Sequence, residues 1–441
     1  MITIFQYEKL SDADRSRLMA RSQASLIDIA PTVQSWLGCI AKDGDVAVMD
    51  YLKTFDQREG RLGWQDAESF RLEVSQEDIA RAYETISEDL RDHIRQQVTL
   101  SRKFHTEYAA TLPQEWETVQ VEGVRAGYRR VSIERAGLYV PAGKAPLPTV
   151  AQILTVAAKA AGVATAVVTF PPCPWESEAA IIVAATEAGA DRIFRVGGIA
   201  AIGALAYGTE SIPKVDKIAG PGNLYVQAAK LFVSDRVGID MFAGPSEAMF
   251  IADDTANPAF IAADVLGQCE HGPDSAGVVV TTSQAMADAI QSEIARQLEK
   301  LDRQAYAATA LERYSAIIVF ASEAEMLDYV DAYAPEHLEI QTVDPVAILE
   351  RLRNVGSAFL GQFAPIAAGD YATGTNHTLP TGGAARYASA VSPETFMRTI
   401  QFQEATREGL GSLEPIVTSI ANAEGLTAHR DSVKIRNSPL E

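Results

Sequence analysis

Four of the six histidines in this chain lie in its C-terminal half, in polar surroundings that suit proton transfer or metal binding. One of them, His337, directly follows Glu336. An adjacent carboxyl group and imidazole can share acid–base work on one substrate, because their environments can set their pKa values apart. At ordinary pKa values, a neutral imidazole and an ionised carboxylate are both present near neutral pH. The pair therefore predicts a catalytic site.

A second group of residues has the composition of a metal site. Gln268 and His271 are three residues apart on a predicted helix over residues 258–270, so both side chains leave one helix face and can converge on one ion. Asp370, in a glycine-containing turn, is a candidate carboxylate ligand. An amide oxygen binds weakly, so such a set would hold zinc with positions open for substrate. Each residue alone is better explained as a capped helix end or a buried polar group, whereas together with His337 and His429 they predict a metal site.

A glycine-containing turn raises the question of a dinucleotide. A predicted strand over residues 215–219 leads into Gly220-Pro221-Gly222-Asn223 and then a helix. This sequence matches the first two glycines of the dinucleotide fingerprint, and the third is missing. Asp240 lies twenty residues after Gly220, where a ribose-binding acid would be expected. An ordinary β–α turn remains the alternative interpretation.

Two further side chains suggest reactions that their surroundings do not favour. Cys269 lies beside a predicted zinc ligand, but on a helix its thiol points away from the face that Gln268 and His271 share, so we expect it to be packed in the core. Ser246 lacks the second glycine of a nucleophile elbow. We therefore expect Ser246 to bind substrate by a hydrogen bond.

The elements that must position these residues alternate between strands and helices. Residues 10–110 are charged and helix-rich, whereas residues 165–170, 176–188 and 192–196 read as strand, helix and strand. The same alternation resumes after residue 255, so we predict two doubly wound α/β units with parallel sheets. The last fifty residues are predicted to be helical, with a polar tail.

Length and composition narrow the class of protein. A chain of 441 residues exceeds what one core normally organises. A formal charge of −20 argues against nucleic acid and anionic membrane surfaces as partners. The three cysteines are too few for a disulfide framework, and neither a signal-peptide core nor a bilayer-spanning apolar run is present, so we expect a cytoplasmic protein.

Six motifs, in this order along the chain, resemble those of histidinol dehydrogenase. They are Gly137-Leu138-Tyr139-Val140-Pro141, residues 215–218 with Gly220-Pro221-Gly222-Asn223, Ala243-Gly244-Pro245-Ser246-Glu247, Glu270-His271-Gly272-Pro273-Asp274, residues 334–339, and residues 369–371 with Gly374-Thr375-Asn376-His377. The resemblance extends from about residue 20 to nearly the end of the chain.

The resemblance implies a set of site residues. Zinc ligands would be Gln268, His271, Asp370 and His429, the last supplied by the partner subunit of a homodimer. The substrate, a small amino alcohol, would be contacted by these ligands and by four further residues: Ser246, His337, His377 and the partner's Glu424. Contacts to NAD would come from Tyr139, Asn223 and the position of Ala200.

The resemblance also implies an aldehyde-dehydrogenase-like fold with two Rossmann-like doubly wound domains and small helical N- and C-terminal appendages. Residues 1–23 would form an N-terminal arm, and residues 24–138 with 247–390 a discontinuous first domain that carries the metal and catalytic residues. Residues 139–246 would form the cofactor domain, and residues 391–441 a tail that reaches the partner subunit.

The family's reaction is a four-electron oxidation of L-histidinol to L-histidine through the aldehyde, with two NAD molecules used in sequence. The resemblance implies that zinc mainly orients the substrate. His337 would take the alcohol proton, and Glu336 would activate water to hydrate the aldehyde.

Departures from the family pattern leave the substrate open. Ala200 stands where the family usually has glutamine, and Ala142 replaces a glycine in a turn. Lys144, just after that turn, is a candidate for binding an anionic substrate. A related zinc- and NAD-dependent dehydrogenase for another primary alcohol, such as a sulfonated propanediol, is the alternative. A zinc hydrolase or binding protein on the same scaffold is the third. The choices of NAD over NADP and of zinc over manganese also stay open.

Overall fold

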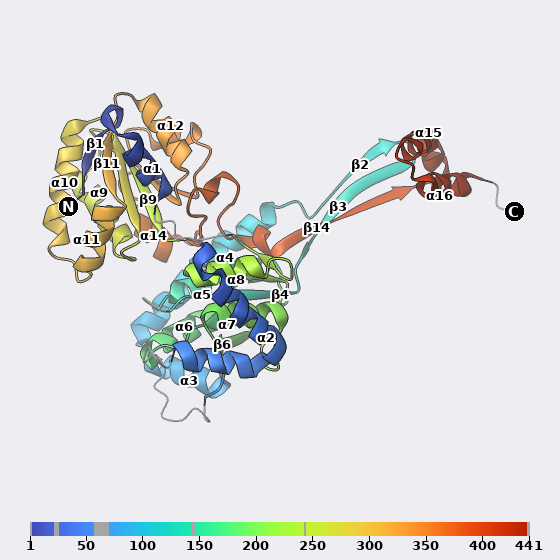
Figure 1. Ribbon diagram of the computed structural model, residues 1–441, viewed down its shortest axis with the longest axis horizontal. Helices are drawn as coiled ribbons and strands as arrows, with labels where there is room; N and C mark the ends of the chain where they lie inside the picture. The colour runs from blue at the N-terminus through green and yellow to red at the C-terminus, as the bar shows by residue number, and fades with distance from the viewer. Residues whose placement is uncertain (1, 22–25, 57–69, 143–145, 242–243, 439–441) are drawn as a thin grey trace.

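The computed structural model describes residues 2–21, 26–56, 70–142, 146–241 and 244–438. Two parallel sheets, each covered by helices, form the body of the molecule, and a narrow antiparallel ribbon projects from it (Figure 1). The predicted fold class, two doubly wound α/β units with helical ends, is confirmed. No helix in the described part of the chain is long and apolar enough to cross a membrane.

The five-stranded parallel sheet has the order β6-β5-β4-β7-β8. Its strands are β4 (Arg135–Tyr139), β5 (Thr165–Phe170), β6 (Arg192–Arg195), β7 (Lys217–Ala219) and β8 (Gly238–Ile239). Helices α5 (Pro148–Ala160) and α6 (Trp175–Ala188) share one hydrophobic cluster, and α7 (Gly198–Tyr207) and α8 (Leu224–Phe232) share another. The strand predicted over residues 165–170 is β5, and its nearly complete burial suits a parallel sheet covered on both faces.

Three N-terminal helices add a further layer to this unit. The helix α2 (Leu26–Phe55) packs on α7 and α8, α3 (Gln76–Thr85) packs on α6, and α4 (Glu88–Thr111) packs on α5 and α6. The expected grouping of residues 24–138 with the catalytic residues differs from this packing. The reason is that the apolar faces of these helices join the two clusters of the five-stranded sheet.

The six-stranded parallel sheet has the order β1-β11-β10-β9-β12-β13. Its strands are β1 (Ile4–Gln6), β9 (Glu247–Ala252), β10 (Ala276–Thr281), β11 (Ala316–Val319), β12 (His337–Gln341) and β13 (Ser357–Leu360). Its helices are α1 (Asp12–Ala20), α9 (Pro258–Cys269), α10 (Gln284–Leu298), α11 (Gln304–Arg313), α12 (Glu323–Tyr333), α13 (Pro345–Glu350) and α14 (Ile366–Tyr371). Residues 2–20 therefore belong to the unit of this sheet, although α2 packs on the other one.

The antiparallel ribbon consists of β2 (Glu115–Val121), β3 (Val124–Ser132) and β14 (Met397–Ala405), with β3 in the middle. It leads to α15 (Arg407–Ala423) and α16 (Thr427–Asn437), which pack on each other at its far end (Figure 1). The prediction that the last fifty residues are helical is wrong for β14. All nine residues of β14 pair with β3, a partner so distant in sequence that no local pattern reveals it.

Candidate active site

A cleft of about 1070 Å³ lies where the two sheets meet. One wall carries the loops that follow strands of the five-stranded sheet, including Pro141, Pro171 and Gly197. The other wall carries the amino ends of strands of the six-stranded sheet, including Ser246 and Ala276. The carboxyl edge of one sheet therefore faces the amino edge of the other.

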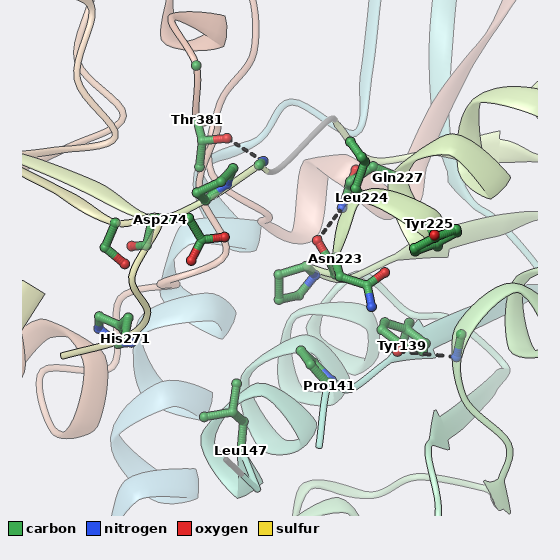
Figure 2. Close-up of a pocket in the computed structure, with 18 of the residues that line it drawn as sticks. Tyr139, Pro141, Leu147, Asn223, Leu224, Tyr225, Gln227, His271, Asp274 and Thr381 are labelled. Atoms are coloured by element: carbon green, nitrogen blue, oxygen red, sulfur yellow. Dashed lines mark hydrogen bonds between the residues drawn. The ribbon is translucent and has the colours of Figure 1, made fainter. Parts of the chain in front are cut away.

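The predicted cofactor residues Tyr139 and Asn223 line the first wall (Figure 2). They lie where the strand order reverses between β4 and β7, which is where doubly wound sheets bind ligands. Asn223 caps α8, its side chain accepting a hydrogen bond of 3.1 Å from the Val226 N–H. Gly220 has a φ of +133°, and a Cβ there would lie 2.1 Å from the Tyr139 carbonyl oxygen, so only glycine allows the two turns to approach so closely.

Two residues expected on this wall are buried in its interior instead. Asp240 forms a fully buried ion pair with Lys230 and accepts a hydrogen bond of 2.8 Å from the Gly220 N–H. It is therefore a support beneath the turn and not a ribose ligand. Ala200 is completely buried in the cluster between α7 and α2, so its side chain has no surface in the cleft. Lys144 lies outside the described residues.

Ser246 lines the opposite wall, and the buried Glu336 behind it belongs to the same hydrogen-bonded group. Glu336 Oε2 accepts bonds from the Glu247 N–H at 2.8 Å and from Ser246 Oγ at 3.1 Å. Gln268 Nε2 in turn donates to Ser246 Oγ at 2.7 Å. Because β9 and β12 are neighbours in the sheet, Ser246 and Glu336, each one residue before its strand, lie side by side. Sequence spacing alone could not show this.

The geometry of His337 determines which ring nitrogen can act as a base. Its Nδ1 lies 3.1 Å from the Glu247 carbonyl oxygen, which can only accept, so Nδ1 carries the hydrogen. Nε2 is then the free lone pair, and it has no hydrogen-bond partner among the described residues. It lies 3.9 Å from Asp370 Oδ1. The basic nitrogen therefore points toward a predicted metal ligand.

Burial shifts the pKa values of Glu336 and His337 in opposite directions. It lowers the pKa of His337 to about 3, so this imidazole is neutral, as expected. Burial raises the pKa of Glu336 well above its usual value, and the carboxyl groups of Glu247 and Asp370 raise it further. This shift works against the ionised Glu336 expected near neutral pH, because a buried carboxylate loses its hydration.

Three of the four predicted metal ligands, Gln268, His271 and Asp370, belong to the unit of the six-stranded sheet that forms this wall. Gln268 is buried, and its Oε1 has no partner among the described residues, so this amide oxygen is free to bind an ion. His271 lies just beyond the end of α9 instead of on it, and it lines the cleft (Figure 2). Burial raises the pKa of Asp370 to about 7, a cost that a bound cation would offset. Amide, imidazole and carboxylate donors together fit a catalytic zinc site.

The structure does not gather all four predicted metal ligands. Among the described residues, no three His, Cys, Asp or Glu side chains lie close enough together to hold a metal ion. His377 lies near His271. Burial lowers the pKa of His377 to about 4, and electrostatic repulsion from His271 contributes to this shift. Glu424 and His429 are exposed at the far end of the ribbon (Figure 1). The structure therefore does not bring them together with the other predicted site residues of the same chain.

Sequence reasoning missed two charged residues at the cleft, Arg21 and Glu247. Their side chains form a buried ion pair with Nε and Oε2 2.9 Å apart. Glu247 stands in the same motif as Ser246, a signal that could have identified it, whereas nothing around Arg21 marks it out. Cys269 is fully buried as expected, and burial raises the pKa of its thiol to about 12.

The chain is similar to known proteins over nearly its whole length. A sequence model described as histidinol dehydrogenase matches residues 19–437. Over 437 residues the chain is 40% identical to the histidinol dehydrogenase of a Synechococcus strain, covering 99% of this chain and 97% of that one. The Methanosarcina barkeri enzyme is 38% identical over 98% of this chain and 97% of its own. The crystal structure of histidinol dehydrogenase from Elizabethkingia anophelis matches with a TM-score of 0.89 at 36% identity, covering 99% and 98% of the two chains.

Proposed function

This chain belongs to the histidinol dehydrogenase family, and from that premise we propose that it oxidises L-histidinol to L-histidine through the aldehyde. The resemblance read from the sequence motifs is thereby confirmed. The observation that best supports the activity is the connected group of Gln268, Ser246, Glu336 and His337 at a cleft whose other wall ends in a dinucleotide-type turn. The proposal places the enzyme in the cytoplasm.

Zinc and NAD are part of the proposal. We infer that Gln268, His271 and Asp370 hold zinc, and that Tyr139 and Asn223 contact NAD. When bound, zinc would orient the substrate and each of two NAD molecules would accept one hydride. The free Gln268 Oε1 and the buried Asp370 support this ligand set.

Two residues of this chain would move the protons. His337 would take the alcohol proton on Nε2, because Nδ1 is held by the Glu247 carbonyl oxygen. Glu336, once ionised, would take a proton from water as that water adds to the aldehyde. Its two hydrogen bonds fall on Oε2, which leaves Oε1 to face the water. The raised pKa makes Glu336 a stronger base than an ordinary carboxylate.

We propose a homodimer in which the ribbon of one subunit brings Glu424 and His429 to the site of the other. Apolar side chains are exposed on the ribbon's terminal helices, at Ile416 and Ile420 of α15 and Ile435 of α16. A subunit contact would cover these side chains. The incomplete metal site within one chain supports the same arrangement.

The direct test follows the absorbance of reduced nicotinamide after NAD and L-histidinol are added to the zinc-loaded protein. We expect two equivalents of reduced cofactor per substrate. Reduction with another primary alcohol but not with histidinol would show a different dehydrogenase. An absence of cofactor reduction with any alcohol would refute the redox function itself.

A further inference from the structure

Arg21, between α1 and α2 in the sequence, lies next to the catalytic group. Arg21 follows α1, which packs on the six-stranded sheet, and α2 packs on the five-stranded sheet. Among the described residues, only Arg21 and Ala334 have a positive φ without being glycine, with values of 58° and 52°. Such backbone conformations persist where the surrounding structure holds them. Arg21 contacts the Tyr333 side chain, and Ala334 follows Tyr333 in sequence, two residues before Glu336.

The Arg21 side chain is held by three contacts. Its Nε lies 2.9 Å from Glu247 Oε2, and the two side chains are only 6% and 3% exposed. Its guanidinium stacks on the Tyr333 ring, 3.8 Å from the centroid, and donates a hydrogen bond to the Tyr333 carbonyl oxygen. The guanidinium group of arginine is a permanent cation, so Arg21 contributes a fixed positive charge to this ion pair.

Glu247 connects Arg21 to both proposed catalytic residues. Its N–H donates to Glu336 Oε2 at 2.8 Å, and its carbonyl oxygen lies 3.1 Å from His337 Nδ1. The other oxygen of its carboxyl group accepts a bond of 3.2 Å from the Gly382 N–H. The side chain of Glu247 thus anchors the short backbone segment that orients Glu336 and His337.

We propose that Arg21 is a positioning residue that acts through Glu247, holding the Ser246-Glu247 backbone where it orients Glu336 and His337 and balancing the Glu247 carboxylate beside Glu336. This inference rests on the proposed function. Glu247 and Glu336 form a pair of neighbouring carboxyl groups. The charged or titratable groups around this pair are Arg21, Tyr333, His337 and Asp370, and Arg21 is the only permanent cation among these four. Without it, two carboxyl groups would share a dry site, and ionising either would oppose ionising the other.

The test compares the two half-reactions of three variants across pH. With Arg21→Gln, we expect kcat for aldehyde oxidation to fall at least about ten-fold with little change in the substrate KM, because base positioning affects the transition state. The acidic limb of its pH profile should move up by about one unit, since the Glu247 charge loses its partner. Glu247→Gln should move that limb down, because it removes a like charge. Arg21→Gln with Glu247→Gln should recover part of the loss.

Arg15→Gln is the matched control. Arg15 lies on α1, which ends just before Arg21; it stacks on the Tyr7 ring and donates to the Tyr7 carbonyl oxygen, without contacting Glu247. We expect it to lower the melting temperature while leaving the pH profile unchanged.

Two results would overturn the inference. One is an Arg21→Gln profile that matches that of Arg15→Gln. The other, decisive if Arg21→Gln does not fold, is a Glu247→Gln limb that stays in place or moves up. A wild-type protein that fails to oxidise histidinol would instead refute the proposed function.

Discussion

Glu336 and His337 are neighbours in sequence, yet they are held by different atoms of the same residue. The N–H of Glu247 binds the carboxyl group, and its carbonyl oxygen binds the imidazole. The first contact favours the ionised carboxylate, and the second fixes which imidazole nitrogen is basic. The backbone of Glu247 therefore influences the protonation of both side chains.

Replacement of each residue should separate the two oxidation steps. Glu336→Gln should slow aldehyde oxidation about 10²- to 10⁴-fold and alcohol oxidation much less, because only hydration of the aldehyde needs the second base. His337→Asn should impair both steps. Because the pKa of Glu336 is raised, wild-type aldehyde oxidation should accelerate as pH rises and Glu336 ionises, and Glu336→Gln should lose this dependence. Single-turnover measurements with histidinol and with the aldehyde would show it.

Glu339→Gln is a matched control for this experiment. It is the same substitution at a buried position in β12, three residues after Glu336, and burial and the neighbouring Asp264 raise the pKa of Glu339 to about 9. Its side chain is therefore already neutral at pH 7, and we expect both half-reactions to be nearly unchanged. Equal losses in both steps for Glu336→Gln would contradict the division of roles.

At the scale of elements, the turn between β7 and α8 depends on a residue pair behind it. Lys230 on α8 donates to the carbonyl oxygens of Gly220 and Met241 and forms an ion pair with Asp240. It therefore joins the two ends of the segment from Gly220 to Met241. Both side chains of the ion pair are fully buried. A buried pair that loses one member leaves an uncompensated charge, which is costlier than the loss of both.

Lys230→Met should therefore lower the free energy of unfolding by about 3–5 kcal/mol and raise the KM for NAD. Lys230→Met combined with Asp240→Asn should be less harmful. The Lys159–Asp191 pair, 2.6 Å long but partly exposed, is the control, and Lys159→Met should cost only about 0–1 kcal/mol. Denaturant titration and NAD kinetics would measure both effects. An unchanged KM for NAD in Lys230→Met would argue against this turn as a cofactor site.

At the scale of the whole molecule, the ribbon makes a shared site plausible. β2, β3 and β14 carry α15 and α16 away from the body, so the proposed ligand His429 is remote from the cleft of its own chain (Figure 1). In the proposed two-fold dimer, the same contact would form twice, and each subunit would complete the site of the other.

Mixed dimers would test this arrangement. Subunits with His271→Ala and subunits with His429→Ala should each be inactive, and random exchange should restore roughly a quarter of wild-type activity, since half the dimers would contain one intact site. Mixing His271→Ala with Asp370→Asn is the control, because both changes lie in the same wall and no intact site can form. Proven mixed dimers without activity would contradict the shared site.

The sequence alone determined the residue types of the site, the alternation of strands and helices, and the family. The turn after residue 219, the Glu336-His337 pair and the strand over residues 165–170 were all readable, because each depends on local spacing or on burial over a few residues.

Only the tertiary structure decided which edges face each other across the cleft, because that depends on how the two sheets pack. It placed Asp240 against Lys230 instead of a ribose, and Arg21 against Glu247, more than 200 residues away in sequence. It also paired β14 with β3 and carried His429 away from its own cleft. Charges and strand edges find partners through long-range packing, and the spacing of residues along a chain does not encode those partners.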